Sequence, residues 1–375
     1  MRKKWIVSLI IVAVFLLMIL DIKHNFIRNF ERLYRELETE SLRNLIEGDH
    51  EGFYHDPSAE LEITDQLIYI GDEIKELYID NGRGSIEIRG EEREDILLSY
   101  KLTVYAASAE LAESFIKELS IVENTTGERL SLKLERKEFP SGVYGVVVDY
   151  DLSVPERLFL DIRNSYGKLG VENIAGDIAV KNEYGHSQIT DIGGRAVINS
   201  QYGKLTVRNI ESNLQVVTRY NTLVDIAHIR GNLNLDIKYS RTKLADIGGN
   251  LDLKADADSV DIDGVKGSLE INAKYTNLTG SGVEGKIRGT ISYGQFDLYQ
   301  LENDIDLKAS YIDIGIHLKD SFDGYLVYCE VENGDIRSNL PYKAEKENRR
   351  QILSGGDGEK IINIVSKYGD IRLYK

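Results

Sequence analysis

Three consecutive segments decide the fold of this chain: YGKLGVENIAGDIAVKNE at 166–183, YGHSQITDIGGRAVINSQ at 184–201 and YGKLTVRNIESNLQVVTR at 202–219. Each is 18 residues long and begins with Tyr-Gly, and apolar residues mostly recur three, five, eight, twelve and fourteen positions after the tyrosine. Alternation of apolar and polar residues with a period of two is typical of half-buried strands, and Asn, Asp and Gly between the alternating stretches favour turns. Each segment therefore predicts two strands joined by a turn.

The same period continues along much of the chain. Tyrosine marks it at Tyr166, Tyr184, Tyr202, Tyr220, Tyr239, Tyr275, Tyr293 and Tyr311, and Ala257 fills the slot that lacks a tyrosine. A lone unit cannot bury its apolar side, whereas units stacked ~4.8 Å apart bury equivalent residues in one core. We therefore predict an all-β protein built on a right-handed β-solenoid of 18-residue coils. The apolar spacing does not fit the six-residue period of a left-handed β-helix.

The regions on either side of the regular coils predict a cap and closing coils. Residues 56–165 are rich in strand patterns without the repeat, and they include one helix at 108–119 that a Ser108 N-cap opens. Open solenoid ends expose unpaired strand edges, so this segment is expected to form the N-terminal cap. Residues 166–375 are expected to form the solenoid repeats and the C-terminal closing coils.

The N-terminus predicts a membrane anchor. Residues 5–20 carry no charge and follow Arg2, Lys3 and Lys4. Residues 1–21 are thus expected to form a cytoplasmic tip and a single transmembrane helix, which leaves the C-terminal domain outside the cytoplasm of a cell-membrane protein. The alternative is a cleaved secretory signal, although the apolar stretch does not end in the small residues of a cleavage site.

Residues 22–55 predict a juxtamembrane helix and a linker. Phe26, Phe30, Leu33 and Leu37 recur at helical spacing. This stripe favours either a stalk helix that packs on its surroundings or a short coiled coil that forms a weak homodimer through 22–48.

Composition excludes several classes of protein. Among 375 residues, 62 Asp and Glu outnumber 46 Lys and Arg, which gives a net charge of −16. Such a charge disfavours nucleic acid and anionic lipid surfaces as partners. Cys329 is the single cysteine, so the chain can form neither an internal disulfide nor a cysteine-based metal site. We expect no cofactor.

The repeat phrases resemble those of a known family. Val154-Pro155 precedes the first full coil, Tyr-Gly-x-Leu-x-Val recurs, and Tyr368-Gly-Asp-Ile-Arg-Leu ends the chain apart from Tyr374 and Lys375. In these features residues 60–375 resemble a bacterial β-strand-repeat family that is named for adhesins although its function is unknown, and that has a toastrack-like domain. The resemblance implies an extracytoplasmic protein of the cell envelope, often linked to envelope-stress signalling.

Two sets of residues are candidate binding sites. The eight tyrosines share the phase of apolar residues in the neighbouring strands, which predicts that their rings point inward as a stacked corner of the core. The alternative is an aromatic strip that stacks on glycans. Asp256, Asp258, Asp261 and Asp263 could supply the oxygen ligands that Ca²⁺ prefers, or they could be ordinary acids on a solvent-facing strand.

These observations favour a non-catalytic, membrane-anchored protein of the cell envelope. It would present an acidic β-solenoid as a scaffold for adhesion, binding or envelope-stress sensing. Its partners would be a cell-wall polymer, a cationic peptide or an envelope signalling protein. Two alternatives are a carbohydrate-active β-helix enzyme, which needs a distinct pair of carboxylates, and a self-assembling structural solenoid.

Overall fold

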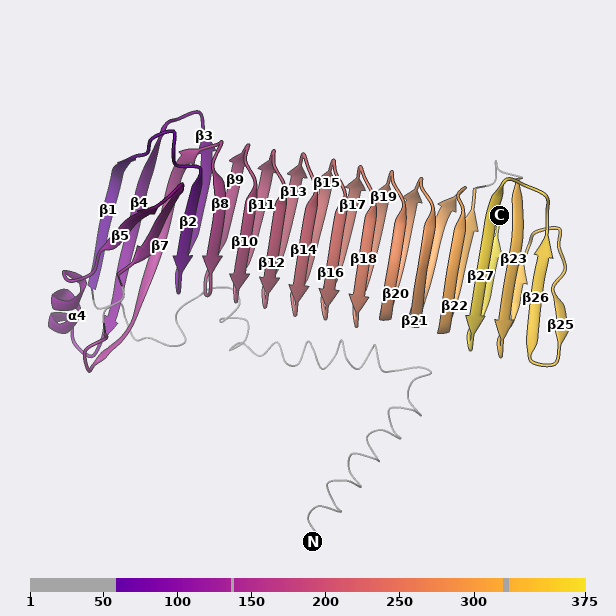
Figure 1. Ribbon diagram of the computed structural model, residues 1–375. Coiled ribbons are helices and arrows are strands. Elements are labelled where there is room, and N and C mark those ends of the chain that lie inside the picture. The colour runs from indigo at the N-terminus through magenta and orange to yellow at the C-terminus, as the bar shows by residue number, and fades with distance from the viewer. Residues whose placement is uncertain (1–58, 136–137, 320–323) are drawn as a thin grey trace, which may run out of the picture. The chain divides into compact units, whose positions relative to one another are not determined.

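The computed structural model describes residues 59–135, 138–319 and 324–375 (Figure 1). The predicted membrane anchor and the predicted juxtamembrane helix lie outside these residues. Within the described part of the chain, no helix is both long enough and apolar enough to cross a membrane.

Strands of neighbouring coils pair in parallel and in register with the 18-residue period. In the coil that starts at Tyr166, Leu169 and Val171 face the core from β9 (Leu169–Ile174), and Ile178 and Val180 face it from β10 (Ile178–Glu183). Each of these residues lies beside its equivalent in the next coil, so the inner positions form rows that are mostly apolar, with the buried Ser187 beside Leu169 as an exception. This register is that of a β-solenoid, and it confirms the predicted stacking of the 18-residue coils.

Two series of strands form the two faces of the coils, and they run side by side in Figure 1. In spatial order, the first series is β5 (Ile121–Thr126), β6 (Arg129–Leu134), β2 (Glu76–Asn81), β8 (Phe159–Asn164), β10, β12 (Ala196–Gln201), β14 (Leu214–Arg219), β16 (Leu233–Lys238), β18 (Leu251–Asp256), the first halves of β20 (Leu269–Val283), β21 (Ile287–Leu301) and β22 (Ile305–Leu318), then β27 (Lys360–Lys367), β23 (Tyr325–Glu332), β26 (Arg350–Gly355) and β25 (Glu345–Glu347). The second series is β1 (Ala59–Tyr69), β4 (Asp95–Ala106), β7 (Val143–Pro155), β3 (Ile86–Glu91), β9, β11 (His186–Ile192), β13 (Lys204–Ile210), β15 (Leu223–Ile229), β17 (Arg241–Ile247), β19 (Ser259–Val265), the second halves of β20 to β22, then β28 (Ile371–Tyr374) and β24 (Ile336–Ser338).

The glycines after Tyr184 and Tyr202 lie where successive coils approach each other closely. A Cβ atom on Gly185 would lie 1.8 Å from the carbonyl oxygen of Gly167, and one on Gly203 would lie 1.9 Å from that of Gly185. A side chain at these two glycines would require the backbone to shift, whereas Asn221 and Ser240 take the equivalent place in later coils. The Tyr-Gly pair therefore marks the corner at which backbones stack most tightly.

The N-terminal region lies against the first regular coil. The first regular coil, β8 and β9, pairs with β2 and β3, and the antiparallel strands β4, β5 and β1 lie beyond them. Helix α4 (Ala109–Ile116) begins at Ser108, whose side chain accepts a hydrogen bond from the backbone nitrogen of Leu111 at 3.3 Å. Its buried residues, Phe115 among them, join the core, so the helix covers apolar surface at this end.

The C-terminal coils do not follow chain order. Strands β27 and β28, the last of the chain, lie between β22 on one side and β23 and β24 on the other. In chain order, β23 and β24 follow β22 but lie one coil further from it in space. The antiparallel strands β25 and β26 come next, and β27 and β28 then occupy the position between β22 and β23. Stacking in chain order would have placed β23 directly against β22.

Candidate functional site

The repeated tyrosines form a ladder of stacked rings at one corner of the coils. Ring centroids of successive members lie 4.7–5.2 Å apart, with interplanar angles of 3–19°. The ladder has two runs, one from Tyr166 to Tyr239 and one from Tyr275 to Tyr368, and Ala257 separates them. Within each run the faces of neighbouring rings cover each other.

The rings lie at the surface rather than in the core, so the predicted inward orientation is wrong. The six most exposed members have exposed fractions between 39% and 53%. The physical reason is the backbone: from Tyr184 onward every ladder residue, including Ala257, has a positive φ of 51–61°. The in-and-out alternation of a strand does not continue through a left-handed residue, because the chain turns there. The ladder thus presents ring edges and hydroxyl groups to solvent along its runs, and ring faces at the run ends.

Two ladder members were missed by the sequence reasoning. Tyr368 stacks on Tyr311 at 4.7 Å because β27 and β28 take the place after β22. Arg83 occupies the equivalent corner between β2 and β3, and its guanidinium carbon lies 5.6 Å from the ring centroid of Tyr166. The Tyr-Gly pair at 368 is a signal that could have identified Tyr368. The phrase also recurs at 83–88, with Gly84, Ile86 and Ile88 at the usual offsets and arginine in place of the tyrosine, so it could have identified Arg83.

The four aspartates proposed as calcium ligands occupy different surroundings. Asp258 is buried with 7% of its surface exposed, whereas Asp261 and Asp263 point outward from β19. Asp256 pairs with Lys238 at 3.8 Å, and Asp263 accepts a hydrogen bond from Ser281 at 3.1 Å. Among the described residues, no group of three or more His, Cys, Asp or Glu side chains is placed to hold a metal ion. Calcium binding by these residues stays a prediction.

Asp258 belongs to a buried polar row beneath the tyrosine corner. Its two carboxylate oxygens accept hydrogen bonds from the backbone nitrogens of Ser240 at 2.6 Å and Asp256 at 2.7 Å. The row continues through Ser240 to Asn221, whose side chain donates to Ser200 at 2.9 Å. Burial raises the pKa of Asp258 to about 7, although its two backbone donors oppose this rise. The carboxyl group therefore changes charge near neutral pH, directly below the break in the ladder.

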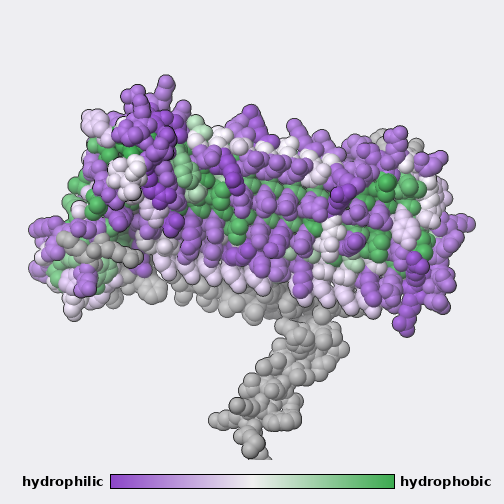
Figure 2. Space-filling model, viewed as in Figure 1, coloured by the Kyte–Doolittle hydropathy of each residue, from purple (hydrophilic) through white to green (hydrophobic). Residues whose placement is uncertain are grey.

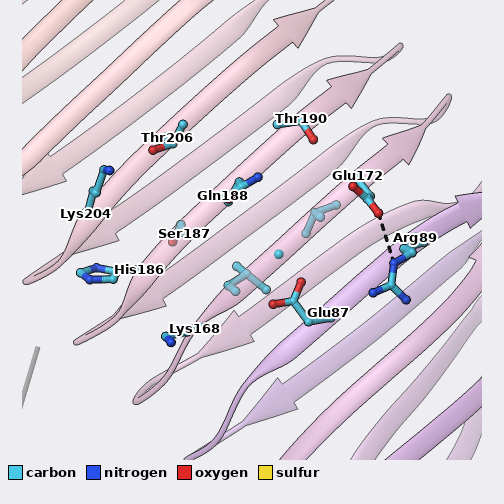
Figure 3. Close-up of a pocket in the computed structure, with 13 residues that line it drawn as sticks. Glu87, Arg89, Lys168, Glu172, His186, Ser187, Gln188, Thr190, Lys204 and Thr206 are labelled. Carbon is cyan, nitrogen blue, oxygen red and sulfur yellow. Dashed lines mark ion pairs between the residues drawn. The ribbon is translucent and has the colours of Figure 1, made fainter. Parts of the chain in front are cut away.

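A hollow of about 430 Å³ lies on the outer surface of the second strand series, over β3, β9, β11 and β13 (Figure 3). Gly170 forms part of its floor, because a Cβ atom there would lie 1.8 Å from a carboxylate oxygen of Glu87. Arg89 pairs with Glu172 at 3.2 Å at one end of the hollow (Figure 3). Partial burial raises the pKa of Glu87, an effect that Arg89 opposes. The mixed lining of Glu, Arg, Lys, Gln and Thr suits a polar ligand or ordered water.

Hydrophilic side chains cover most of the face seen in Figure 2. The first 58 residues contain eight Lys and Arg and nine Asp and Glu, so nearly all of the net charge of −16 comes from the residues that follow. Cross-coil ion pairs such as Arg208–Asp225 at 2.6 Å and Arg219–Asp236 at 3.1 Å use only part of these acids. Most of the excess lies in the cap at 59–165, where 23 Asp and Glu face 12 Lys and Arg, whereas the coils at 166–319 hold 20 and 17. The acidic surface is therefore strongest at the capped end of the solenoid.

Comparison with known proteins identifies the family. A family model described as Toastrack DUF4097 matches residues 74–374. Among solved structures, a "putative cell adhesion protein" from Clostridium sporogenes is similar, with 12% identity, a TM-score of 0.19, and 85% of this chain and 99% of that chain covered. No curated protein matches. Since the family model spans most of the sequence, including every regular coil and every described strand after β1, this chain belongs to the Toastrack DUF4097 family.

Proposed function

We propose that this protein is a non-catalytic scaffold of the cell envelope, anchored by residues 5–20, whose acidic solenoid binds cationic partners outside the cytoplasm. The observation that carries the proposal is the coil register. Equivalent outward positions repeat in every coil. The cap at 59–165, which continues the same two strand series, holds most of the excess acid, with a net charge of −11. A long surface of one charge attracts extended partners of the opposite charge. We also propose that the coils wind in a right-handed sense.

The most perturbed carboxylate supports a structural role for the acids. Asp258 is enclosed beneath the corner and hydrogen-bonded to backbone nitrogens, which holds two strands together. Glycoside hydrolysis instead uses two carboxyl groups that face each other across an open groove. Asp258 therefore does not fit the role of a catalytic carboxyl group that faces an open groove.

Two measurements on the purified full-length chain test this function. Fluorescence anisotropy with labelled hexalysine should show binding that weakens steeply as salt rises from about 50 to 500 mM, because screening shortens the reach of exposed charges. Incubation with purified cell-wall sacculi should release no soluble fragments. Absence of peptide binding at low salt, or turnover of the sacculi, would refute the proposal.

A further inference from the structure

The break in the tyrosine ladder at Ala257 exposes ring faces that the rest of the ladder covers. One step of the ladder is 4.7–5.2 Å, so the rings of Tyr239 and Tyr275, which are two coils apart, leave a space of ~9.6 Å between their centroids. One flat group fits there, in contact with both faces. Ala257 keeps the left-handed backbone of the tyrosines, with φ of 61°, and lacks only the ring.

Cations occupy the other open faces of the ladder. Arg83 lies over Tyr166 at the beginning of the first run, and the Lys367 ammonium lies 5.6 Å from the Tyr368 centroid at the end of the second. Within the gap, the Lys274 ammonium lies 4.9 Å from the Tyr275 centroid. Tyr293 covers the opposite face of Tyr275 at 4.8 Å, so Lys274 lies on the side of Ala257.

The face of Tyr239 that looks into the gap is the exception. No cation of the described residues lies over it, although Asp256 provides a half-exposed carboxylate on the strand that leads to Ala257. At the start of the ladder the chain itself places an arginine in a ladder position, against the face of a tyrosine. A guanidinium is planar, retains its charge and stacks on aromatic faces, so its shape and charge suit a slot one ring thick.

We propose that the gap at Ala257 is a binding slot for an arginine side chain of a cationic polypeptide, whose guanidinium stacks between Tyr239 and Tyr275 and displaces the Lys274 ammonium. The slot rests on the proposed function, because it assigns one specific contact to the acidic scaffold. Lys274 acts as an internal competitor that occupies half of the slot until a partner arrives.

The decisive variant is Ala257→Tyr, which fills the slot without altering charge. The full-length chain in phosphatidylcholine nanodiscs, which carry no net charge, is titrated into labelled hexa-arginine and labelled hexalysine. Loss of contact with two ring faces should weaken hexa-arginine binding by about five- to thirtyfold and abolish the preference for arginine over lysine. Ala257→Ser, which keeps the gap, should bind as the unaltered protein does.

A second variant gives the opposite change. Lys274→Gln removes the internal competitor and should bind hexa-arginine more tightly than Lys181→Gln, a control that removes one exposed lysine from β10. Equal hexa-arginine affinity in the unaltered protein and Ala257→Tyr, or equal affinity of the two lysine variants, would overturn the slot while leaving the acidic scaffold intact. If the unaltered protein binds neither peptide, the slot and the proposed function both fail.

Discussion

The buried carboxyl group of Asp258 should make the stability of the solenoid fall as pH rises from about 4 to 7. Its pKa is about 7 in the folded chain, against an ordinary value of 3.8 that applies once the chain unfolds. Below pH 3.8 the group is protonated in both states and contributes no difference. Above that value the unfolded state loses its proton first, so folding becomes progressively less favourable until the folded pKa is passed.

The two pKa values set the size of this effect. Their difference corresponds to about 4 kcal/mol in the free energy of unfolding, or about 1.4 kcal/mol for each pH unit within the window. Asp258 is only 7% exposed, so little solvent screening reduces it. Asp258→Asn removes the titration at a cost of about 1 kcal/mol, because an amide has one acceptor for two backbone donors. Asn221 shows that an amide fits the same corner two coils earlier.

The assay is guanidinium unfolding, followed by circular dichroism at pH values from 4 to 8, for a chain that begins at residue 56 and for its Asp258→Asn variant. Other carboxyl groups titrate in both proteins and cancel in the difference. We expect the variant to be less stable at pH 4 and more stable at pH 8. A difference that does not change with pH would show that Asp258 is ionised throughout and that its backbone donors outweigh its burial.

Three further substitutions test the packing of the coils. Gly185→Ala places a methyl group 1.8 Å from the carbonyl oxygen of Gly167, so we expect a loss of more than about 2 kcal/mol by thermal unfolding, whereas Gly82→Ala, which meets nothing within 4 Å, should change little. Leu205→Ala removes a fully buried side chain and should lower the free energy of unfolding by about 2–5 kcal/mol in denaturant titrations; a loss below 1 kcal/mol would contradict a close-packed core. Ala257→Tyr joins the two ladder runs through two new ring contacts and should raise the melting temperature, with a net gain of about 1 kcal/mol; a lower melting temperature would show that the gap does not accept a ring.

Much of the fold was predictable because the coils depend on local and nearest-neighbour rules. The alternation of apolar and polar residues determines where the strands lie, and the N-cap at Ser108 determines where the helix begins. Because successive segments have the same spacing, equivalent residues lie side by side. The stacking of Tyr184 on Tyr202 follows from the same register. None of these features requires knowledge of residues more than one coil away.

The candidate sites were predicted less completely. The tyrosine set was correct as a stacked group, but the left-handed backbone at Tyr184 and its equivalents turned the rings to the surface. Asp258 was grouped with neighbouring acids along the chain, whereas burial separates it from Asp261. The hollow at Gly170 depends on a residue of the cap, Glu87, which lies far away in sequence.

The sequence by itself determined the coil period, the two strands of each coil and the position of the missing ring at Ala257. The reason is that residues at the same place in successive repeats pack against one another, so the repeat shows which residues are in contact. Only the tertiary structure decided that the last strands of the sequence, β27 and β28, lie between β22 on one side and β23 and β24 on the other. Any parallel strand with the same apolar pattern can pair with the open edge of β22, so the choice depends on how the chain returns through β26. The contact between Arg83 and Tyr166 likewise depends on the pairing of the cap strands with the first coil, whereas Lys274 and Lys367 directly precede the tyrosines that they cover.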